Sequence, residues 1–408
     1  MKPHGIRQTS LALILSGGLA VATSQPSNAA TMYSVQDLGS LGVSGIRAEG
    51  INNLGQVVGL TYTESDNNFV VQGFRTNPNS PVNPNTDYID PITGDTAVPT
   101  DINDLGQVTG YLPGTSTLTY AGFRTAPNSR INLDTDIIGE GTFNFANAIN
   151  NSGQVAVYQF LGRGGTRSFR TAPNSLINQQ TDNIGNLGGV QPNGTSFTRA
   201  TDINDLGQVV GSSDNASGQT HAFRTAPNSP INPATDDLGT LGGDNSDATA
   251  INNLGQVVGS SRTADGQTRA FRTAPNSAIN PNTDDLGTLG GSLSSATDIN
   301  DSGQVVGYST TATGENRAFL YDDGELFDLN SLIDTDLDVT LDYAVGINNR
   351  GQIIAQSGWF TSDSPTSIRA FLLTPIVSTV PEPSLGLGLL AFAGMGGSLI
   401  AKGKKSSA

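Results

Sequence analysis

The chain has 408 residues with 50 Gly, 20 Pro, no Cys, 14% charged residues and a formal net charge of −16. The lack of Cys excludes disulfides and thiolate sites, and the two histidines, His4 and His221, disfavour catalytic triads and clustered His metal sites. Acidic excess argues against nucleic acid as a partner, while abundant Gly, few charges and 36% hydrophobic residues predict a folded, strand-rich protein.

The N-terminus has the order of a secretory signal peptide. Lys2 and Arg7 precede an apolar run over residues 11–22, and small residues follow up to Ala29 and Ala30. A basic region, a short apolar region and small residues before a cleavage point define such a signal. We therefore expect residues 1–30 to be removed by signal peptidase after Ala29 or Ala30.

The body of the chain, residues 31–376, is one unit repeated seven times. The motif Ile-Asn-x-x-Gly-Gln recurs at spacings of 51, 47, 54, 48, 48 and 48 residues, and a Phe follows each motif by 20 to 24 residues. The motifs begin at Ile51, Ile102, Ile149, Ile203, Ile251, Ile299 and Ile347, and the Phe residues are Phe74, Phe123, Phe169, Phe223, Phe271, Phe319 and Phe371.

Each unit is expected to form four short strands. In the fifth unit these are residues 248–252, 256–260, 269–273 and 284–288, which are β-branched or aromatic segments bounded by Gly, Asn, Asp and Pro. Asn252 to Gly255 should form a tight turn, with Gly255 at positive φ. No long segment of the body has a helical apolar period, so helices should be nearly absent.

A period near 48 residues with four strands predicts an all-β, seven-bladed β-propeller. A lone strand at residues 33–39 precedes the first motif, and no fourth strand follows Phe371. The N-terminal strand should therefore complete the last blade and close the ring, which leaves no free terminal sheet edge. Contact between residues 33–39 and 368–374 tests this closure.

The repeat resembles the HAF repeat of extracellular bacterial proteins, named for His-Ala-Phe. His221-Ala222-Phe223 matches it literally, and Arg replaces His at Arg269, Arg317 and Arg369. The resemblance covers about 340 residues. It implies an extracellular protein but brings no defined chemistry.

The first five units share Phe-Arg-Thr-x-Pro-Asn-Ser after the third strand. Because Pro fixes φ and lacks a donor, these insertions should be ordered surface loops. Two interpretations stay open: a repetitive surface that binds a polymer by multivalency, or a structurally useful loop copied by duplication. The candidate binding residues are Asn79, Ser80, Asn128, Ser129, Asn174, Ser175, Asn228, Ser229, Asn276 and Ser277.

Other candidate sites are weaker. His221 occupies the position that Arg holds in later repeats, which favours a role on the strand surface. The Arg that follows the repeat Phe in each of the first five units should pair with acidic neighbours. Asp334, Asp336 and Asp338 alternate and suggest calcium, but they lack the Gly and terminal Glu of the helix-loop-helix calcium motif, so a solvated loop is favoured. Trp359 and Phe360 would stack on a sugar or pack against a neighbouring blade.

In the C-terminus, residues 377–408, Pro381, Glu382 and Pro383 precede an apolar segment over 385–401, and Lys residues follow at once. This order resembles the PEP-CTERM sorting signal of Gram-negative bacteria and cyanobacteria. The resemblance implies recognition by an exosortase, removal of the tail and delivery to the cell surface or exopolysaccharide matrix. The alternative is an uncleaved tail that anchors the protein in the membrane.

Together these features predict a secreted, non-catalytic propeller that is structural or binds extracellular polysaccharide, without a cofactor unless calcium binds. Its only membrane contact would be the C-terminal segment before cleavage. The enzyme alternative is a carboxylate-dependent glycosidase or lyase, with an acid and a base at the ring axis. Repetition argues against it, because catalysis needs an asymmetric constellation.

Overall fold

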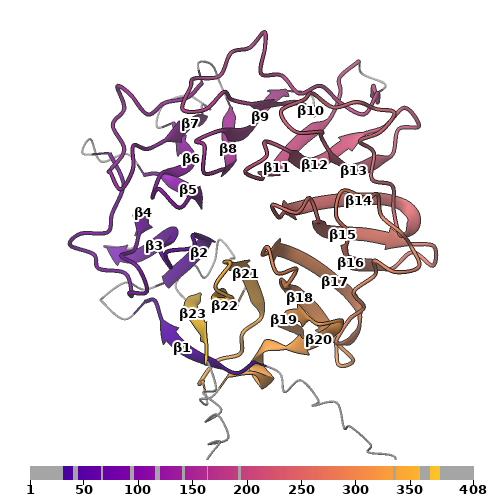
Figure 1. Cartoon of the computed structure of the whole chain (residues 1–408). Coiled ribbons are helices and arrows are strands. Elements are labelled where there is room, and N and C mark those ends of the chain that lie inside the picture. The colour runs from indigo at the N-terminus through magenta and orange to yellow at the C-terminus, as the bar shows by residue number, and fades with distance from the viewer. Residues whose placement is uncertain are drawn as a thin grey trace, which may run out of the picture.

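The computed structural model describes residues 31–39, 45–65, 68–91, 96–114, 120–139, 143–162, 164–191, 194–333, 337–358 and 368–376. In this part of the chain the regular elements are β-strands and one turn of 3-10 helix, η1 (Leu329–Ser331). Small antiparallel sheets surround a common centre, which is the arrangement of a β-propeller (Figure 1). The expectation of an all-β protein is confirmed.

Each motif repeat forms antiparallel strands in chain order, with the Ile of the motif ending the first strand. In repeats 1 to 4 the strands are β2 (Gly45–Ile51), β3 (Val57–Ser65), β4 (Asn68–Arg75); β5 (Val98–Ile102), β6 (Val108–Pro113), β7 (Tyr120–Arg124); β8 (Asn144–Ile149), β9 (Val155–Gly162), β10 (Gly165–Arg170); and β11 (Thr198–Ile203), β12 (Val209–Asp214), β13 (Thr220–Arg224). Later repeats contain β14 (Gly242–Ile251), β15 (Val257–Thr263), β16 (Thr268–Arg272); β17 (Gly290–Ile299), β18 (Val305–Thr311), β19 (Asn316–Asp322), β20 (Glu325–Asp328); and β21 (Tyr343–Ile347), β22 (Ile353–Ser357), β23 (Arg369–Pro375).

The turn after the first strand forms as predicted. Gly255 has φ +74° and donates its N–H to the Asn252 carbonyl at 3.0 Å. The fourth strand is shorter than expected in repeats 1 to 5, where the outer segment pairs as an isolated bridge such as Phe271 with Asp285. Gly287 explains why the pairing stops, because it has φ +78° and donates its N–H to the Asp285 carboxylate at 2.8 Å.

The N-terminal strand β1 (Tyr33–Asp37) pairs antiparallel with β23, so residues from the two ends of the described chain share one sheet (Figure 1). Tyr33 lies opposite Pro375, and Asp37 lies opposite Phe371. Tyr33 and Leu38 are fully buried. The predicted contact between residues 33–39 and the Phe371 strand is therefore present.

The core lies between adjacent sheets. All seven repeat Phe residues are 0% exposed, and each packs with apolar side chains of its own repeat and a neighbouring one. Phe271, for example, clusters with Val257 of its own sheet and with Val210 and Ala222 of the preceding sheet. The Phe repeat thus encodes contacts between sheets.

Several predictions concern residues outside those described. They are the signal peptide with Ala29 and Ala30, the sorting signal with Pro381, Glu382, Pro383 and the segment 385–401, the aspartates Asp334 and Asp336, and the pair Trp359 and Phe360. Among the described residues, no helix has the length and apolar character needed to cross a membrane.

Candidate functional site

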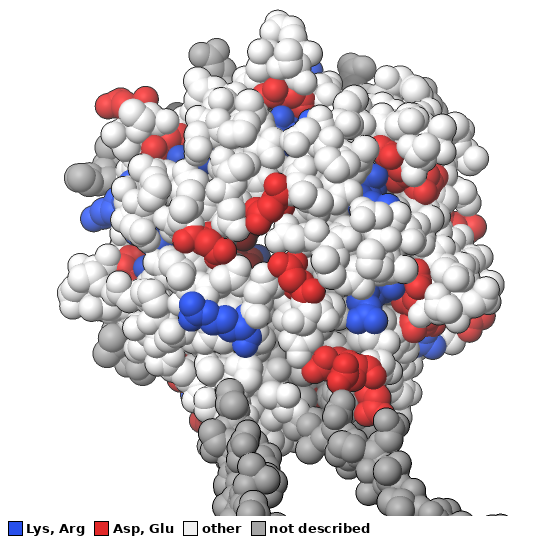
Figure 2. Space-filling view, viewed as in Figure 1, with Lys and Arg blue, Asp and Glu red and all other residues white. Residues whose placement is uncertain are grey.

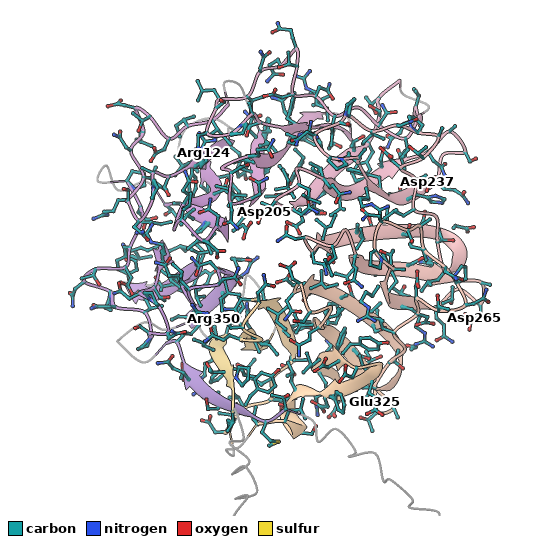
Figure 3. All side chains as sticks on the ribbon, viewed as in Figure 1. Arg124, Asp205, Asp237, Asp265, Glu325 and Arg350 are labelled. Carbon is teal, nitrogen blue, oxygen red and sulfur yellow. The ribbon has the colours of Figure 1, made fainter. Side chains whose placement is uncertain are left out.

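The Ile-Asn motifs meet at the ring axis, where they line a cavity of about 180 Å³. Its walls consist of the motif Ile, the Asn and the following Asn or Asp from all seven repeats, with Asp101 and Asp298 among them. Figure 3 places Asp205 and Arg350, from the turns of the fourth and seventh repeats, close to this centre. The repeated motif therefore builds the axis of the molecule.

The motif Asn residues form a continuous ring of hydrogen bonds. Each Nδ2 donates to the motif Gln of its own repeat and to the backbone carbonyl of the Asn in the next repeat, at 3.0 to 3.2 Å for the second bond. The bond from Asn348 to the Asn52 carbonyl, 3.0 Å long, links the last motif to the first. These buried amides hold neighbouring repeats together and leave no group free for chemistry.

Replacing one amide tests this structural role. In Asn204→Ala the chain loses bonds to Gln208 Oε1 and the Asn252 carbonyl, and two backbone N–H groups lose their acceptor. Buried polar groups left without partners cost about 1–3 kcal/mol each, so we expect a loss of about 3 kcal/mol in the free energy of unfolding. Denaturant titration measures it, with the exposed loop variant Asn77→Ala as control; equal stability of the two variants would contradict the role.

A second, exposed ring surrounds one mouth of the cavity. The residue after each motif Asn alternates between amide and carboxylate in the order Asn53, Asp104, Asn151, Asp205, Asn253, Asp301 and Asn349. Each backbone N–H in this ring donates to the side chain of the next repeat, as Asn53 does to Asp104 at 2.8 Å. Acidic side chains accordingly gather around the centre of this face (Figure 2).

A deeper layer of three carboxylates surrounds the axis, and two of them, Asp101 and Asp298, line the cavity itself. Asp101, Asp202 and Asp298 stand just before the motif Ile in alternate repeats, where the other repeats have Gly or Ala. Each carboxylate accepts the N–H of its own Ile and that of the next repeat's Ile, at 2.7 to 2.9 Å. The small residues leave room, since a Cβ on Gly50 would already lie 3.4 Å from Asp101 Oδ1.

Burial in the ring raises the pKa of these three carboxyls. The pKa of Asp101 rises to about 8, first through burial and then through the charge of Asp202, and that of Asp298 rises to about 7 for the same two reasons. Burial alone raises the pKa of Asp202 to about 6, against hydrogen bonds that favour the ionised form. At neutral pH the layer therefore keeps part of its protons.

Sequence reasoning missed both acidic layers, although the signal was present. Repeats 2, 4 and 6 read Asp-Ile-Asn-Asp, whereas the odd-numbered repeats have Gly or Ala before Ile-Asn-Asn. Comparing even with odd repeats would have found this alternation. The predicted unit treated all repeats as equal copies.

The Asn residues of the candidate binding loops lie exposed on the ring surface but take part in contacts between repeats. Each has φ of 51° to 54°, and each donates its N–H to the turn Gly of its own repeat. Asn228 Oδ1 accepts from Gln154 of the preceding repeat at 3.0 Å, and equivalent bonds reach Asn79, Asn128, Asn174 and Asn276. The shared loop is therefore a connection between neighbouring sheets.

The loop Ser residues have a local role, and their carbonyls bind the preceding repeat's Arg. Ser229 Oγ donates to the Pro227 carbonyl at 3.1 Å, as Ser80, Ser129, Ser175 and Ser277 do in their loops.

The Ser229 carbonyl accepts from Arg170 at 2.9 Å. The same bond to a backbone carbonyl of the next repeat is made by Arg75, Arg124, Arg170 and Arg224. Burial lowers the pKa of each, and the charge of an acidic neighbour opposes this; those neighbours are Asp87, Asp136, Asp182 and Asp236.

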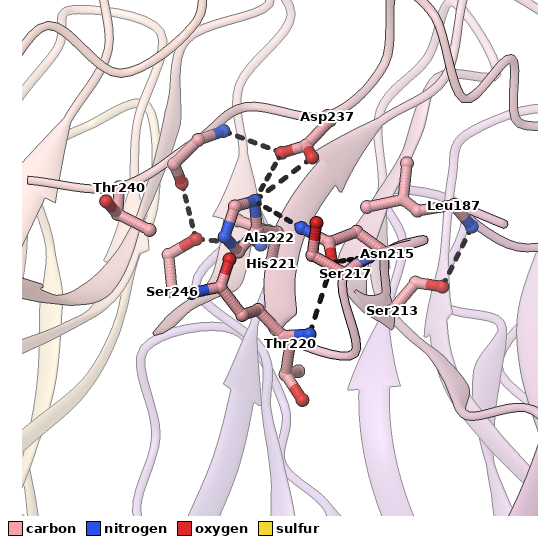
Figure 4. Close-up of polar contacts among 12 residues, drawn as sticks. Leu187, Ser213, Asn215, Ser217, Thr220, His221, Ala222, Asp237, Thr240 and Ser246 are labelled. Atoms are coloured by element: carbon pink, nitrogen blue, oxygen red, sulfur yellow. Dashed lines mark hydrogen bonds and ion pairs between the residues drawn. The ribbon is translucent and has the colours of Figure 1, made fainter. Parts of the chain in front are cut away.

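His221 lies on β13 beside Asp237 (Figure 4). It is not among the residues that line the axial cavity. Its Nδ1 is 2.8 Å from Asp237 Oδ1, and the pair joins the third strand to the outer segment. Burial acts to raise the pKa of Asp237, but hydrogen bonds from His221 and Gly239 outweigh it and hold the pKa below its usual value. Arg369 makes the equivalent contact with Asp37 at 2.6 Å.

Asp338, the described member of the alternating calcium candidates, is 2.6 Å from Arg369, and this bond lowers its pKa. Its carboxylate thus already has a cationic partner. Within the described ranges, no group of three or more His, Cys, Asp or Glu side chains is arranged to hold a metal ion.

Comparison with known families adds one match. Residues 245–369 match the DUF3466 family model. That family is described as a protein of unknown function, and the matched segment contains the motifs at Ile251, Ile299 and Ile347. No curated protein matches the chain in sequence.

Solved structures that resemble the chain include propellers from proteins of different activities. A prolyl endopeptidase aligns at 10% identity and TM-score 0.48, over 81% of this chain and 46% of that one. BP39L lectin from Burkholderia pseudomallei aligns at 12% identity and TM-score 0.39 (85% and 98% covered). The β-propeller domain of the Trilobed protease from Pyrococcus furiosus aligns at 10% and 0.32 (85% of each). The chain spans about half the length of the endopeptidase, and these similarities carry no argument about activity.

Proposed function

We propose that the protein is a secreted, non-catalytic, closed seven-bladed propeller of the HAF-repeat type, which the PEP-CTERM signal directs to the cell surface or exopolysaccharide matrix. There it acts as a structural component that contacts extracellular polymer. The observation that supports this best is the use of the repeated side chains. The motif Asn, the loop Asn and the Arg after the repeat Phe all form hydrogen bonds to neighbouring repeats. The repeated side chains therefore stabilise the ring.

Seven motif repeats, the β1–β23 pairing and the bond from Asn348 to Asn52 support seven blades in a closed ring. An enzyme at the axis is the weaker alternative. Its support is the raised pKa of Asp101, Asp202 and Asp298, which suits an acid or base. However, a cavity of about 180 Å³ is smaller than the roughly 300–1,000 Å³ of small-molecule sites, so a polysaccharide would not fit there.

Delivery is tested by replacing Pro381, Glu382 and Pro383 with Ala in the full chain. In the native host we expect the unchanged protein in the extracellular matrix with a shortened C-terminus, and the variant in the membrane fraction with its tail intact. Cell fractionation and the mass of the C-terminal peptide measure both results. If the variant is processed and exported like the unchanged protein, the sorting proposal is wrong.

A control distinguishes loss of sorting from loss of folding. Ser384→Ala changes the next residue and leaves the Pro-Glu-Pro triplet intact, so it should behave as the unchanged chain. Matrix extracted with salt and then with a polysaccharide-degrading enzyme mixture shows whether release needs the polymer. Release by salt alone would favour simple surface adhesion over a role within the matrix.

A further inference from the structure

A cavity of about 550 Å³ lies between the fourth and fifth repeats, away from the ring axis. It lies among β12 and β13 on one side and β14 and β15 on the other, with Phe197 and Gln191 from the segment before β11. Its volume falls in the range of about 300–1,000 Å³ that small-molecule sites occupy. The axial cavity is far smaller.

Two of the lining residues, Gln191 and Phe197, come from a segment that breaks the repeat. The third and fourth motifs are 54 residues apart, whereas later motifs are 48 apart, and the additional chain lies before β11. Gly189 donates its N–H to the Asp214 carbonyl at 2.9 Å, and Gln191 Nε2 donates to Asp214 Oδ2 at 3.0 Å. Thr220 donates to the other oxygen of Asp214 at 2.9 Å. The wall is thus fixed by a buried carboxylate whose oxygens are occupied.

Four of the other lining side chains are available to a ligand. Asp247 and Arg262 are exposed, and neither side chain makes a hydrogen bond or ion pair with the described residues. Ser260 adds a hydroxyl between them on β15, and Phe197 adds a half-buried aromatic ring. One acceptor, one donor, a hydroxyl and an apolar ring face therefore surround the same space.

We propose that this cavity binds a neutral saccharide unit, which rests on the proposed function as a protein that contacts extracellular polymer. A sugar ring presents C–H groups on one face, which pack against the negative face of an aromatic ring such as Phe197. Its hydroxyls both donate and accept, so Asp247 accepts from them while Arg262 donates to them. Two carboxylates, Asp214 and Asp247, against one Arg262 disfavour an anionic sugar.

Calorimetric titration of the full chain tests the site with D-glucose, D-galactose, D-mannose, cellobiose and D-galacturonate as probes. We expect saturable one-site binding of at least one neutral sugar, with a Kd on the order of 1 mM, and weaker binding of galacturonate. Asp247→Asn and Phe197→Ala should each weaken binding about tenfold or more, because one removes a charged acceptor and the other the apolar face. No saturable binding of any neutral probe, or tighter binding of galacturonate, would overturn the proposal.

Matched variants separate the site from general effects. Asp244→Asn makes the same change on β14 outside the cavity lining, and Phe160→Ala removes an aromatic ring that is 39% exposed elsewhere. Both should bind like the unchanged chain, and equal weakening in them would contradict the assignment. If Asp247→Asn and Phe197→Ala bind the neutral sugars as tightly as the unchanged chain, the saccharide site is wrong. If the protein is still retained in the matrix in that case, the proposed function stands. Failure of export in the sorting test affects the proposed function alone.

Discussion

A chain that lacks residues 1–39 should fail to form a stable ring. The deletion removes β1 and with it Tyr33 and Leu38, both 0% exposed, and it leaves the outer edge of β23 unpaired. Loss of a buried Leu costs about 2–5 kcal/mol and loss of a buried aromatic ring about 3–5 kcal/mol. The expected loss, on the order of 5 kcal/mol or more, is comparable to the whole stability of many proteins.

The matched control is a chain that starts at Ala30, which retains β1. Circular dichroism during urea titration and size-exclusion chromatography compare the two. The shorter chain should unfold at lower urea and associate, since an open strand edge pairs with other molecules. Coincident unfolding curves would mean that β1 contributes nothing to the last sheet, and closure by the N-terminal strand would be refuted.

Stability should fall as pH rises from about 4 to about 8. The folded state keeps protons on Asp101, Asp202 and Asp298 at pH values where the unfolded chain releases them, because burial raises their pKa to about 8, 6 and 7 from an ordinary value near 4. Where the folded state binds more protons, the free energy of unfolding decreases with pH. We expect a decrease of several kcal/mol across this window, since each unit by which folding raises a pKa corresponds to about 1.4 kcal/mol. Urea titrations at half-unit pH steps measure it.

The triple variant Asp101→Asn, Asp202→Asn, Asp298→Asn should have a clearly shallower slope. Part of the slope should remain, because burial also raises the pKa of Glu49 to about 7, against the charge of Arg47. Slopes are compared instead of absolute stabilities, since an amide oxygen replaces only one of the two acceptors in each carboxylate. Asp104→Asn on the exposed rim is the control, and an unchanged slope in the triple variant would contradict the assignment.

The sequence predicted the features that depend on local chemistry. The positive φ of Gly255, the burial of Phe271 and the pairing of residues 33–39 with the Phe371 strand follow from turn residues, apolar spacing and the chain ends. The role of Asn228 was not predictable in this way. An exposed Asn in a loop resembles a ligand contact, and only the neighbouring repeat's Gln154, 74 residues earlier in the chain, assigns it to the ring.

The two acidic layers could not be predicted from a single repeat. Asp101 and Asp104 read as ordinary strand and turn residues within one unit, and their role appears only when they meet their counterparts around the axis. The length of the outer strand was also misjudged, because Gly287 at positive φ ends the pairing just after Asp285. The cavity near Phe197 lies where the motif spacing lengthens to 54 residues, and a longer spacing alone does not predict a cavity.

The alternation of amide and carboxylate side chains on the rim cannot be perfect, because the number of motifs is odd. Two kinds of residue can alternate perfectly around a ring only if the number of positions is even. The ring has seven motifs, so two residues of the same kind must be neighbours at one position. They meet at Asn349 and Asn53, where the Asn349 N–H donates to Asn53 Oδ1 at 2.7 Å. An amide serves as its own partner because it both donates and accepts, whereas two facing carboxylates would repel. The unavoidable mismatch therefore falls on the uncharged pair, at the same junction where the first and last repeats meet.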